Sequence, residues 1–102
     1  MTQSGPFDLT VQEELHVGRA DEVARLARLE IDDFCWFMSD KRGRRILWRL
    51  LESSGVFRSS HTGNALQTAF LEGQRCLGLQ QFAMATRHAP TLYTRMAQEN
   101  SR

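Results

Sequence analysis

The stretch that decides the fold runs from Asp40 to Arg75 and reads DKRGRRILWRLLESSGVFRSSHTGNALQTAFLEGQR. Asp40 is a favourable N-cap, and Gly55 followed by Val56 is typical of a helix that ends in the left-handed conformation. The sequence therefore predicts a helix at about 41–54. Apolar or small residues between these ends recur at helical spacing and form a stripe that we expect to face the core: Gly43, Ile46, Leu47, Leu50 and Leu51.

The next predicted helix begins after Asn64, because Asn64 and Gln67 have the spacing of a capping box. It extends to about Thr86 and is apolar on two sides. We expect the first side to face the core: Leu66, Ala69, Phe70, Gly73, Leu77 and Met84. The opposite side becomes a second apolar face for assembly, since a helix apolar on two sides is either central to its domain or shared with a partner: Leu71, Leu79 and Phe82.

The order of these pieces resembles one family of proteins. The run GRRILWRLLESSGVF at 43–57 is followed by a polar turn that ends in Gly63 and Asn64, and then by AFLEGQRCLGL at 69–79. Together they resemble a family of small virion or morphogenesis proteins of short-tailed, podovirus-type bacteriophages, encoded beside the structural genes. The resemblance covers residues from about Phe34 to Leu79. It implies a phage virion or morphogenesis protein and supplies no catalytic residue.

The chain as a whole favours an all-α fold. It has 102 residues and only two prolines, and it lacks alternating β-branched runs. A first long helix is expected at about 19–38 and a short last helix at 90–98. We predict a small antiparallel bundle of three main helices plus this short C-terminal helix. The expected divisions are an N-terminal arm at 1–18, interrupted at Gly18 and partly flexible, a helical domain at 19–99, and a tail at 100–102.

Charge divides the chain into two parts. Residues 1–40 hold nine acidic and three basic side chains, a net charge of −6, whereas residues 41–102 hold three acidic and ten basic side chains, a net charge of +7. One explanation is intramolecular, with an acidic first helix beside a basic second one. The other is head-to-tail assembly, in which the acidic face of one subunit meets the basic face of its neighbour.

Basic residues crowd the start of the helix at 41–54, where the helix dipole disfavours cations. A tryptophan lies among them, away from the expected core stripe. We regard five residues as candidates for binding a partner or phosphate: Arg42, Arg44, Arg45, Trp48 and Arg49. A protein interface would use the tryptophan as an anchor, and a nucleic acid would contact the arginines. A solvated basic face neutralised by nearby aspartates is the third interpretation.

A few other side chains raise structural questions. Glu30 falls within the expected apolar face of the first long helix, so it needs either a partner such as Arg49 or Arg75, or access to solvent. Glu72 and Arg75 are three residues apart and are expected to pair locally or to reach the first two helices. Cys35 and Cys76 are widely separated and are expected to be buried, reduced thiols.

The residues by themselves favour a helical interaction module with divided charge, and the family resemblance implies a non-enzymatic structural protein of a phage virion, present in several copies at the portal or tail or in the internal core. It would assist particle assembly or DNA ejection and would bind itself and other virion proteins such as portal or tail proteins, with possible DNA contact. No cofactor, metal, small molecule or membrane is expected, and the protein would occur in the virion and in the host cytoplasm during assembly. The alternative is a small nucleic-acid-binding phage regulator or packaging accessory that uses its arginine-rich helix face.

Overall fold

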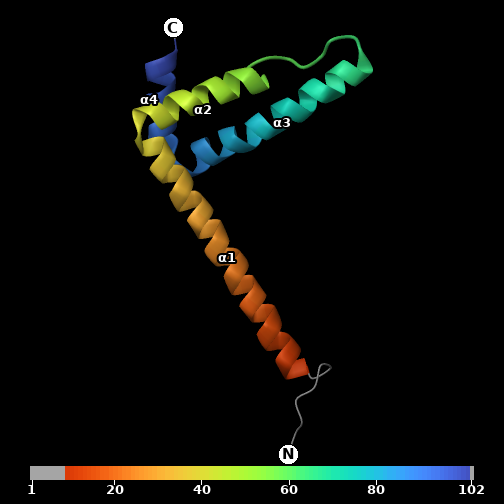
Figure 1. Cartoon of the computed structure of the whole chain (residues 1–102), viewed down its shortest axis with the longest axis vertical. Coiled ribbons are helices and arrows are strands. Elements are labelled where there is room, and N and C mark those ends of the chain that lie inside the picture. The colour runs from red at the N-terminus through yellow and green to blue at the C-terminus, as the bar shows by residue number, and fades with distance from the viewer. Residues whose placement is uncertain (1–8, 102) are drawn as a thin grey trace, which may run out of the picture. The chain divides into compact units, whose positions relative to one another are not determined.

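The computed structural model describes residues 9–101, which form four α-helices and no strand (Figure 1). The helices are α1 (Leu9–Ser39), α2 (Lys41–Ser54), α3 (Ala65–His88) and α4 (Pro90–Asn100). The predicted all-α class is confirmed, and the predicted helices at 41–54, 65–86 and 90–98 are each found within two residues of the expected ends. Residues 1–8 of the expected N-terminal arm and residue 102 of the expected tail lie outside the described residues.

The chain divides into two compact units, Met1–Asp32 and Asp33–Arg102, and α1 contributes to both of them. The described part of the first unit is a single helix. The expected interruption at Gly18 was wrong, because α1 continues through this glycine without a break. A glycine inside a helix costs about 1 kcal/mol relative to alanine but keeps its backbone hydrogen bonds. On the same helix, Arg25 forms two hydrogen bonds with the carboxylate of Glu22 at 2.6 and 3.0 Å.

Both ends of α2 have the caps that the sequence predicts. The carboxylate of Asp40 accepts a hydrogen bond from the backbone N–H of Arg42 at 2.7 Å. At the other end Gly55 has φ 80°, and the backbone N–H groups of Gly55 and Val56 donate to the carbonyl groups of Glu52 and Leu51. These bonds satisfy carbonyl groups that the end of a helix leaves without partners. The direction of the chain is therefore fixed on both sides of α2.

The core of the second unit is small and lies where α2, α3 and α4 pack against one another. It combines residues from the last turn of α1, from all three of these helices, from the loop after α2 and from the junction between α3 and α4: Met38, Leu47, Leu51, Val56, Ala85, Ala89 and Met96. Figure 1 shows α4 crossing near the start of α2 and the end of α3. Ala89 separates α3 from α4, and Pro90 begins α4 at a position where its missing N–H leaves no helical bond unmade.

Two glycines allow close contacts in this unit. A Cβ atom at Gly43 would overlap the carbonyl oxygen of Phe37, so only glycine permits this approach of α2 to the end of α1. A Cβ atom at Gly78 would overlap Ser54 and lie 2.6 Å from Cγ2 of Val56. Close approach of the backbone therefore explains the glycine at position 78 of α3. Gly73 has no such neighbour.

Several expected core residues are exposed. Gly43, Leu47 and Leu51 of the predicted α2 stripe are buried, but Ile46 and Leu50 are exposed, so the stripe is narrower than expected. The reason is that other elements pack against one side of α2 only, and a helix buries a side chain fully only where another element covers it. Cys76 is also exposed, which contradicts its expected burial, whereas Cys35 is half-buried and donates to the carbonyl group of His88.

Candidate functional site

Arg44 is the one arginine among the candidates in the arginine-rich segment whose side chain is buried. Its side chain is 5% exposed, and its Nε and Nη2 atoms donate to the two carboxylate oxygens of Glu99 at 2.8 and 2.9 Å. Its Nη1 atom donates to the carbonyl oxygen of Met38 at 2.9 Å. These hydrogen bonds raise the pKa of the Arg44 guanidinium and lower the pKa of the Glu99 carboxyl group. Arg44 therefore ties α2 to α4 and to the end of α1.

This position corrects the assignment of Arg44 to a surface that binds a partner or phosphate. The sequence contained a signal for its burial, because Arg44 precedes Leu47 and Leu51 by three and seven residues and so shares their side of the helix. Its partner Glu99 was missed. Glu99 lies 55 residues further along the chain, and no local pattern connects the two positions.

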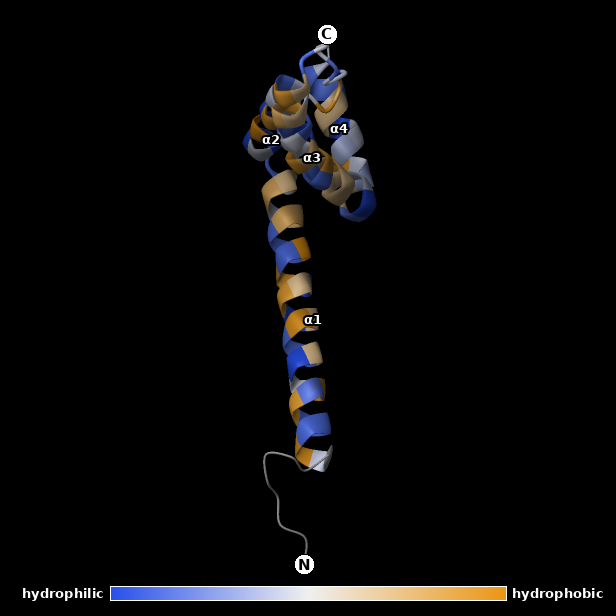
Figure 2. Cartoon of the chain, turned by 90° about the vertical axis from the view of Figure 1, so that its right-hand side faces the viewer, coloured by the Kyte–Doolittle hydropathy of each residue, from blue (hydrophilic) through white to orange (hydrophobic). Residues whose placement is uncertain are grey.

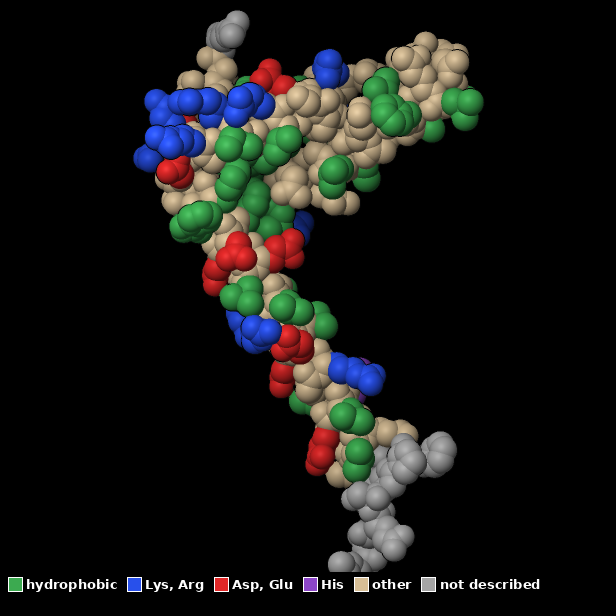
Figure 3. All heavy atoms as spheres, in the orientation of Figure 1, with side chains coloured by type: hydrophobic (Ala, Val, Ile, Leu, Met, Phe, Trp, Pro, Cys, Tyr) green, Lys and Arg blue, Asp and Glu red, His purple; other side chains and the backbone are tan. Residues whose placement is uncertain are grey.

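The other three arginines of the segment form an exposed row. Arg42, Arg45 and Arg49 are spaced by three and four residues on α2, and all three are exposed. None of them has an ion pair or a side-chain hydrogen bond within residues 9–101. Figure 3 shows blue side chains gathered where α2 begins. We call these three residues the arginine row; its charge is available to a partner.

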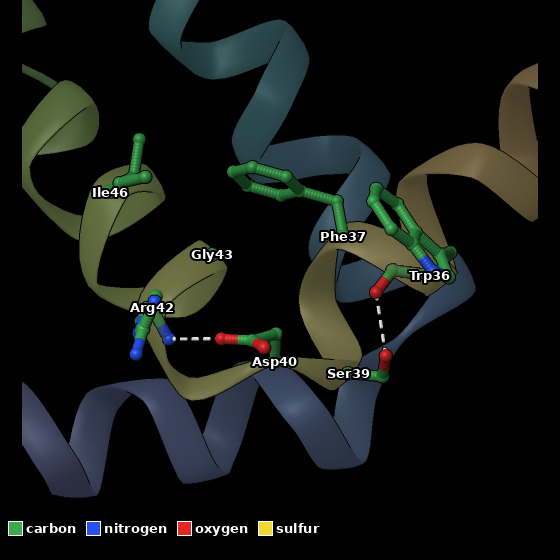
Figure 4. A pocket seen from close by; sticks show the side chains of 7 residues that line it. All are labelled: Trp36, Phe37, Ser39, Asp40, Arg42, Gly43 and Ile46. Carbon is green, nitrogen blue, oxygen red and sulfur yellow. Dashed lines mark hydrogen bonds between the residues drawn. The ribbon is translucent and has the colours of Figure 1, made fainter.

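The first turn of α2 is less suited to a free anion than the sequence suggests. Helix N-termini bind anions through unpaired backbone N–H groups. Here the carboxylate of Asp40 already accepts from the backbone of Arg42. Beside this cap lies a hollow of about 340 Å³, and Figure 4 shows Phe37 between Ile46 and Trp36 in its lining. One backbone N–H of the first turn is therefore occupied, whereas the side chains of the arginine row remain exposed to an anion.

Trp48 belongs to a series of aromatic contacts. Its ring lies 5.4 Å from that of Phe57, Phe57 lies 6.4 Å from Phe82, and Phe82 lies 5.4 Å from Tyr93, all between ring centroids. The series links α2, the following loop, α3 and α4. Trp48 is half-buried as a result, so its contacts hold the unit together, and its expected role as an interface anchor stays a prediction.

The structural polar candidates lie apart. Nη1 of Arg75 is 3.7 Å from Oε1 of Glu72, which is the local pairing considered above. The hydroxyl group of Ser60 donates to the same carboxylate, and Nε of Arg75 is buried without a hydrogen-bond partner. Glu30 lies in the first unit with an exposed side chain, so solvent reaches it.

The two apolar sides of α3 are reversed relative to the expectation. Leu79 and Phe82, assigned to assembly, pack against the core, and Leu71 is half-buried. The side expected to be core is the open one: Leu66 is 85%, Phe70 65% and Leu77 62% exposed. Between α2 and α3 lies a mainly apolar hollow of about 370 Å³ lined by Leu50, Leu51, Ser53, Ser54, Gln74, Leu77, Gly78 and Gln81. We call Leu50, Leu66, Phe70 and Leu77 the open apolar surface.

Among residues 9–101 no group of three or more histidine, cysteine, aspartate or glutamate side chains could hold a metal ion. Within the same residues, no helix has the length and apolar character needed to span a membrane.

The described residues thus define a small, all-helical protein whose second unit presents an arginine row beside an open apolar surface. The family model for the Bbp19-like phage protein matches residues 34–98, so the chain belongs to this family of phage proteins. The matched segment falls within the second unit, and residues 9–32 lie outside it. Searches of curated proteins and of solved structures gave no significant match.

Proposed function

We propose that this chain is a non-enzymatic structural protein of a short-tailed, podovirus-type phage. It would be present in several copies at the portal or tail or in the internal core, and it would assist particle assembly or DNA ejection. The observation that carries this proposal is the open apolar surface of a chain from a phage protein family. Exposed apolar surfaces of this kind mark sites of protein association.

The packing of the second unit is consistent with such a role. Contacts among α2, α3 and α4 support packing of these helices together, and the proposal keeps their predicted antiparallel arrangement. The core of this unit uses only one side of α2 and one side of α3, so the remaining sides are free for contacts with neighbours. The protein would bind copies of itself and other virion proteins such as portal or tail proteins, and it would occur in the host cytoplasm before assembly.

The proposal is tested by mass spectrometry of purified phage particles. The amount of this protein is measured against the portal protein in the same digest, and a non-structural phage protein from the same infection serves as the control for contamination. A fixed ratio to the portal over successive purification steps is expected. Absence from particles, while the protein is abundant in infected cells, would contradict the structural role.

The second candidate function is nucleic-acid binding, either as a phage regulator or as a packaging accessory. It is favoured by the arginine row, whose three side chains have no acidic partner within the described residues. Arginine pairs readily with phosphate oxygens.

Binding to a short DNA duplex, measured by fluorescence anisotropy over a range of salt concentrations, tests this candidate. Each lost phosphate contact should reduce the slope of log affinity against log salt by about 0.9. Replacing Arg42, Arg45 and Arg49 with glutamine should remove binding. The variant with Arg87 and Arg95 replaced by glutamine is the control, since both residues are exposed and lie on α3 and α4. Equal binding by the two variants would rule out the arginine row.

A further inference from the structure

The open apolar surface of the second unit is exposed to solvent in the structure. Leu50 and Leu77 flank the hollow between α2 and α3, and Phe70 and Leu66 continue along the same side of α3 at intervals of seven and four residues. The hollow is mainly apolar, although two serines and two glutamines also line it, and an amphipathic helix could place its apolar side against Leu50 and Leu77 there. Green side chains are visible on α3 in Figure 3.

The first unit offers such a helix. Its described residues form one helix, and a single helix cannot bury its own apolar side chains. Val23, Leu26 and Leu29 are therefore exposed, at spacings of three residues. Figure 2 shows hydrophobic residues recurring along α1 among hydrophilic ones. Glu30 follows Leu26 by four residues, so a carboxylate lies on the same side as these apolar residues.

The charges of the two units are complementary. Residues 9–32 hold six acidic and three basic side chains, and residues 33–102 hold five acidic and ten basic ones. The positive charge adjoins the open apolar surface, because Arg42 and Arg49 are four and three residues from Ile46, which is exposed beside Leu50. An occupant of this surface should therefore combine an apolar stripe with carboxylates.

We propose that residues 9–32 of one copy dock through Val23, Leu26 and Leu29 on the open apolar surface of a second copy, with Glu30 facing the arginine row. This inference rests on the proposed structural role, which requires several copies side by side. The contact is heterologous, since each copy gives its helix to one neighbour and receives a helix from another. Contacts of this kind close into rings or extend into filaments.

Disulfide trapping between two different chains tests the contact. Both chains carry Cys35→Ala and Cys76→Ala; one adds Leu26→Cys and the other, with a mass tag, adds Leu77→Cys. Circular dichroism verifies that both fold. Mixing under mild oxidation is expected to give a covalent dimer with one chain of each kind. A mixture in which Gln98→Cys, at an exposed position on α4, replaces Leu77→Cys should not give it.

Two outcomes would overturn the inference. One is the absence of the mixed dimer when each variant is folded. The other is that a chain carrying both Leu26→Cys and Leu77→Cys closes a disulfide within itself and no dimer forms on mixing, because the helix would then dock on its own chain.

Charge exchange gives an independent test by analytical ultracentrifugation. Arg49→Glu is expected to weaken self-association roughly fivefold, the upper range for an exposed ion pair. Combining it with Glu30→Arg should restore the wild-type value. Arg87→Glu, the matched charge change on α3, should leave association unchanged. Equal weakening by Arg49→Glu and Arg87→Glu, without rescue, would show that only net charge matters and would contradict the proposed contact.

These results are separable from the proposed function. If the protein is found in particles at a fixed ratio to the portal but the mixed dimer never forms, the docking contact is wrong and the structural role stands. If the mixed dimer forms but the protein is absent from particles, the contact stands and the virion role is wrong.

Discussion

The neighbouring leucines at positions 50 and 51 test the burial pattern of α2 most directly. Leu51 is 0% exposed in the core, whereas Leu50 is 57% exposed beside the hollow between α2 and α3. Replacing each with alanine removes the same atoms at successive positions of one helix. Any difference in stability between the two variants therefore comes from the surroundings of the side chains and not from helix propensity.

The expected magnitudes differ severalfold. Truncating a fully buried leucine to alanine costs about 2 to 5 kcal/mol, because a cavity remains where the side chain was. For Leu50→Ala less than half of the side chain is covered, and about 25 cal/mol per Å² of apolar area then gives a cost below about 1 kcal/mol. A small domain has only about 5 to 15 kcal/mol of stability. Leu51→Ala should therefore lower the melting temperature by about 8 °C or more, at about 4 to 8 °C per kcal/mol.

Urea denaturation followed by circular dichroism at 222 nm measures both variants. The protein concentration must be kept low, since association stabilises the folded state by mass action and would hide the intrinsic cost of Leu50→Ala. Repeating the measurement at high concentration should then reveal a larger loss for Leu50→Ala if that residue contacts a neighbour. Equal costs for the two variants at low concentration would refute the burial pattern on which the open apolar surface depends.

Three further changes test other parts of the second unit. Gly78→Ala should destabilise the protein by about 1 to 3 kcal/mol through overpacking against Ser54, while Gly73→Ala, which meets no atom within 4 Å, should stabilise it by roughly 0.5 to 1 kcal/mol in thermal melts. Asn64→Ala removes the cap of α3 and should cost about 0.5 to 2 kcal/mol; no loss would contradict the cap. The hydrogen bonds with Arg44 lower the pKa of Glu99 in the folded protein, so this residue adds to the free energy of unfolding above its ordinary pKa of 4.5. That stabilisation is lost as the pH falls below 4.5. Glu99→Gln should therefore make the free energy of unfolding depend less on pH in this acidic range.

Much of this fold could be predicted because its signals are local. The caps at Asp40, Gly55 and Asn64 require only residues within one turn of each other, and the structure contains all three. Gly18 was misread because a glycine within a helix and a glycine between helices look alike in sequence. The choice between them depends on the whole length of the helix and not on the single residue.

The candidate site was harder to predict because it depends on contacts between distant segments. Both sides of α3 are apolar, so helical periodicity identifies the two sides but not which of them α2 and α4 cover. Gly78 was the informative residue, since its close approach to Ser54 and Val56 shows which side faces α2. The spacing of Arg44 from Leu47 likewise indicates that Arg44 lies on the buried side of α2. No local pattern indicates that Glu99 on α4 is its partner, because the two residues are far apart in the sequence.

The excess of positive charge in the second unit now connects the two candidate functions. Residues 33–102 hold ten basic and five acidic side chains, and one of these carboxylates, Glu99, is committed to Arg44. The arginine row has no acidic partner within the described residues, so an acidic helix of a neighbour and a phosphate backbone would compete for the same guanidinium groups. A DNA duplex added to the associated protein should then dissociate it if the arginine row serves both purposes. Association that is indifferent to DNA would separate the two functions and leave the open apolar surface as the principal contact.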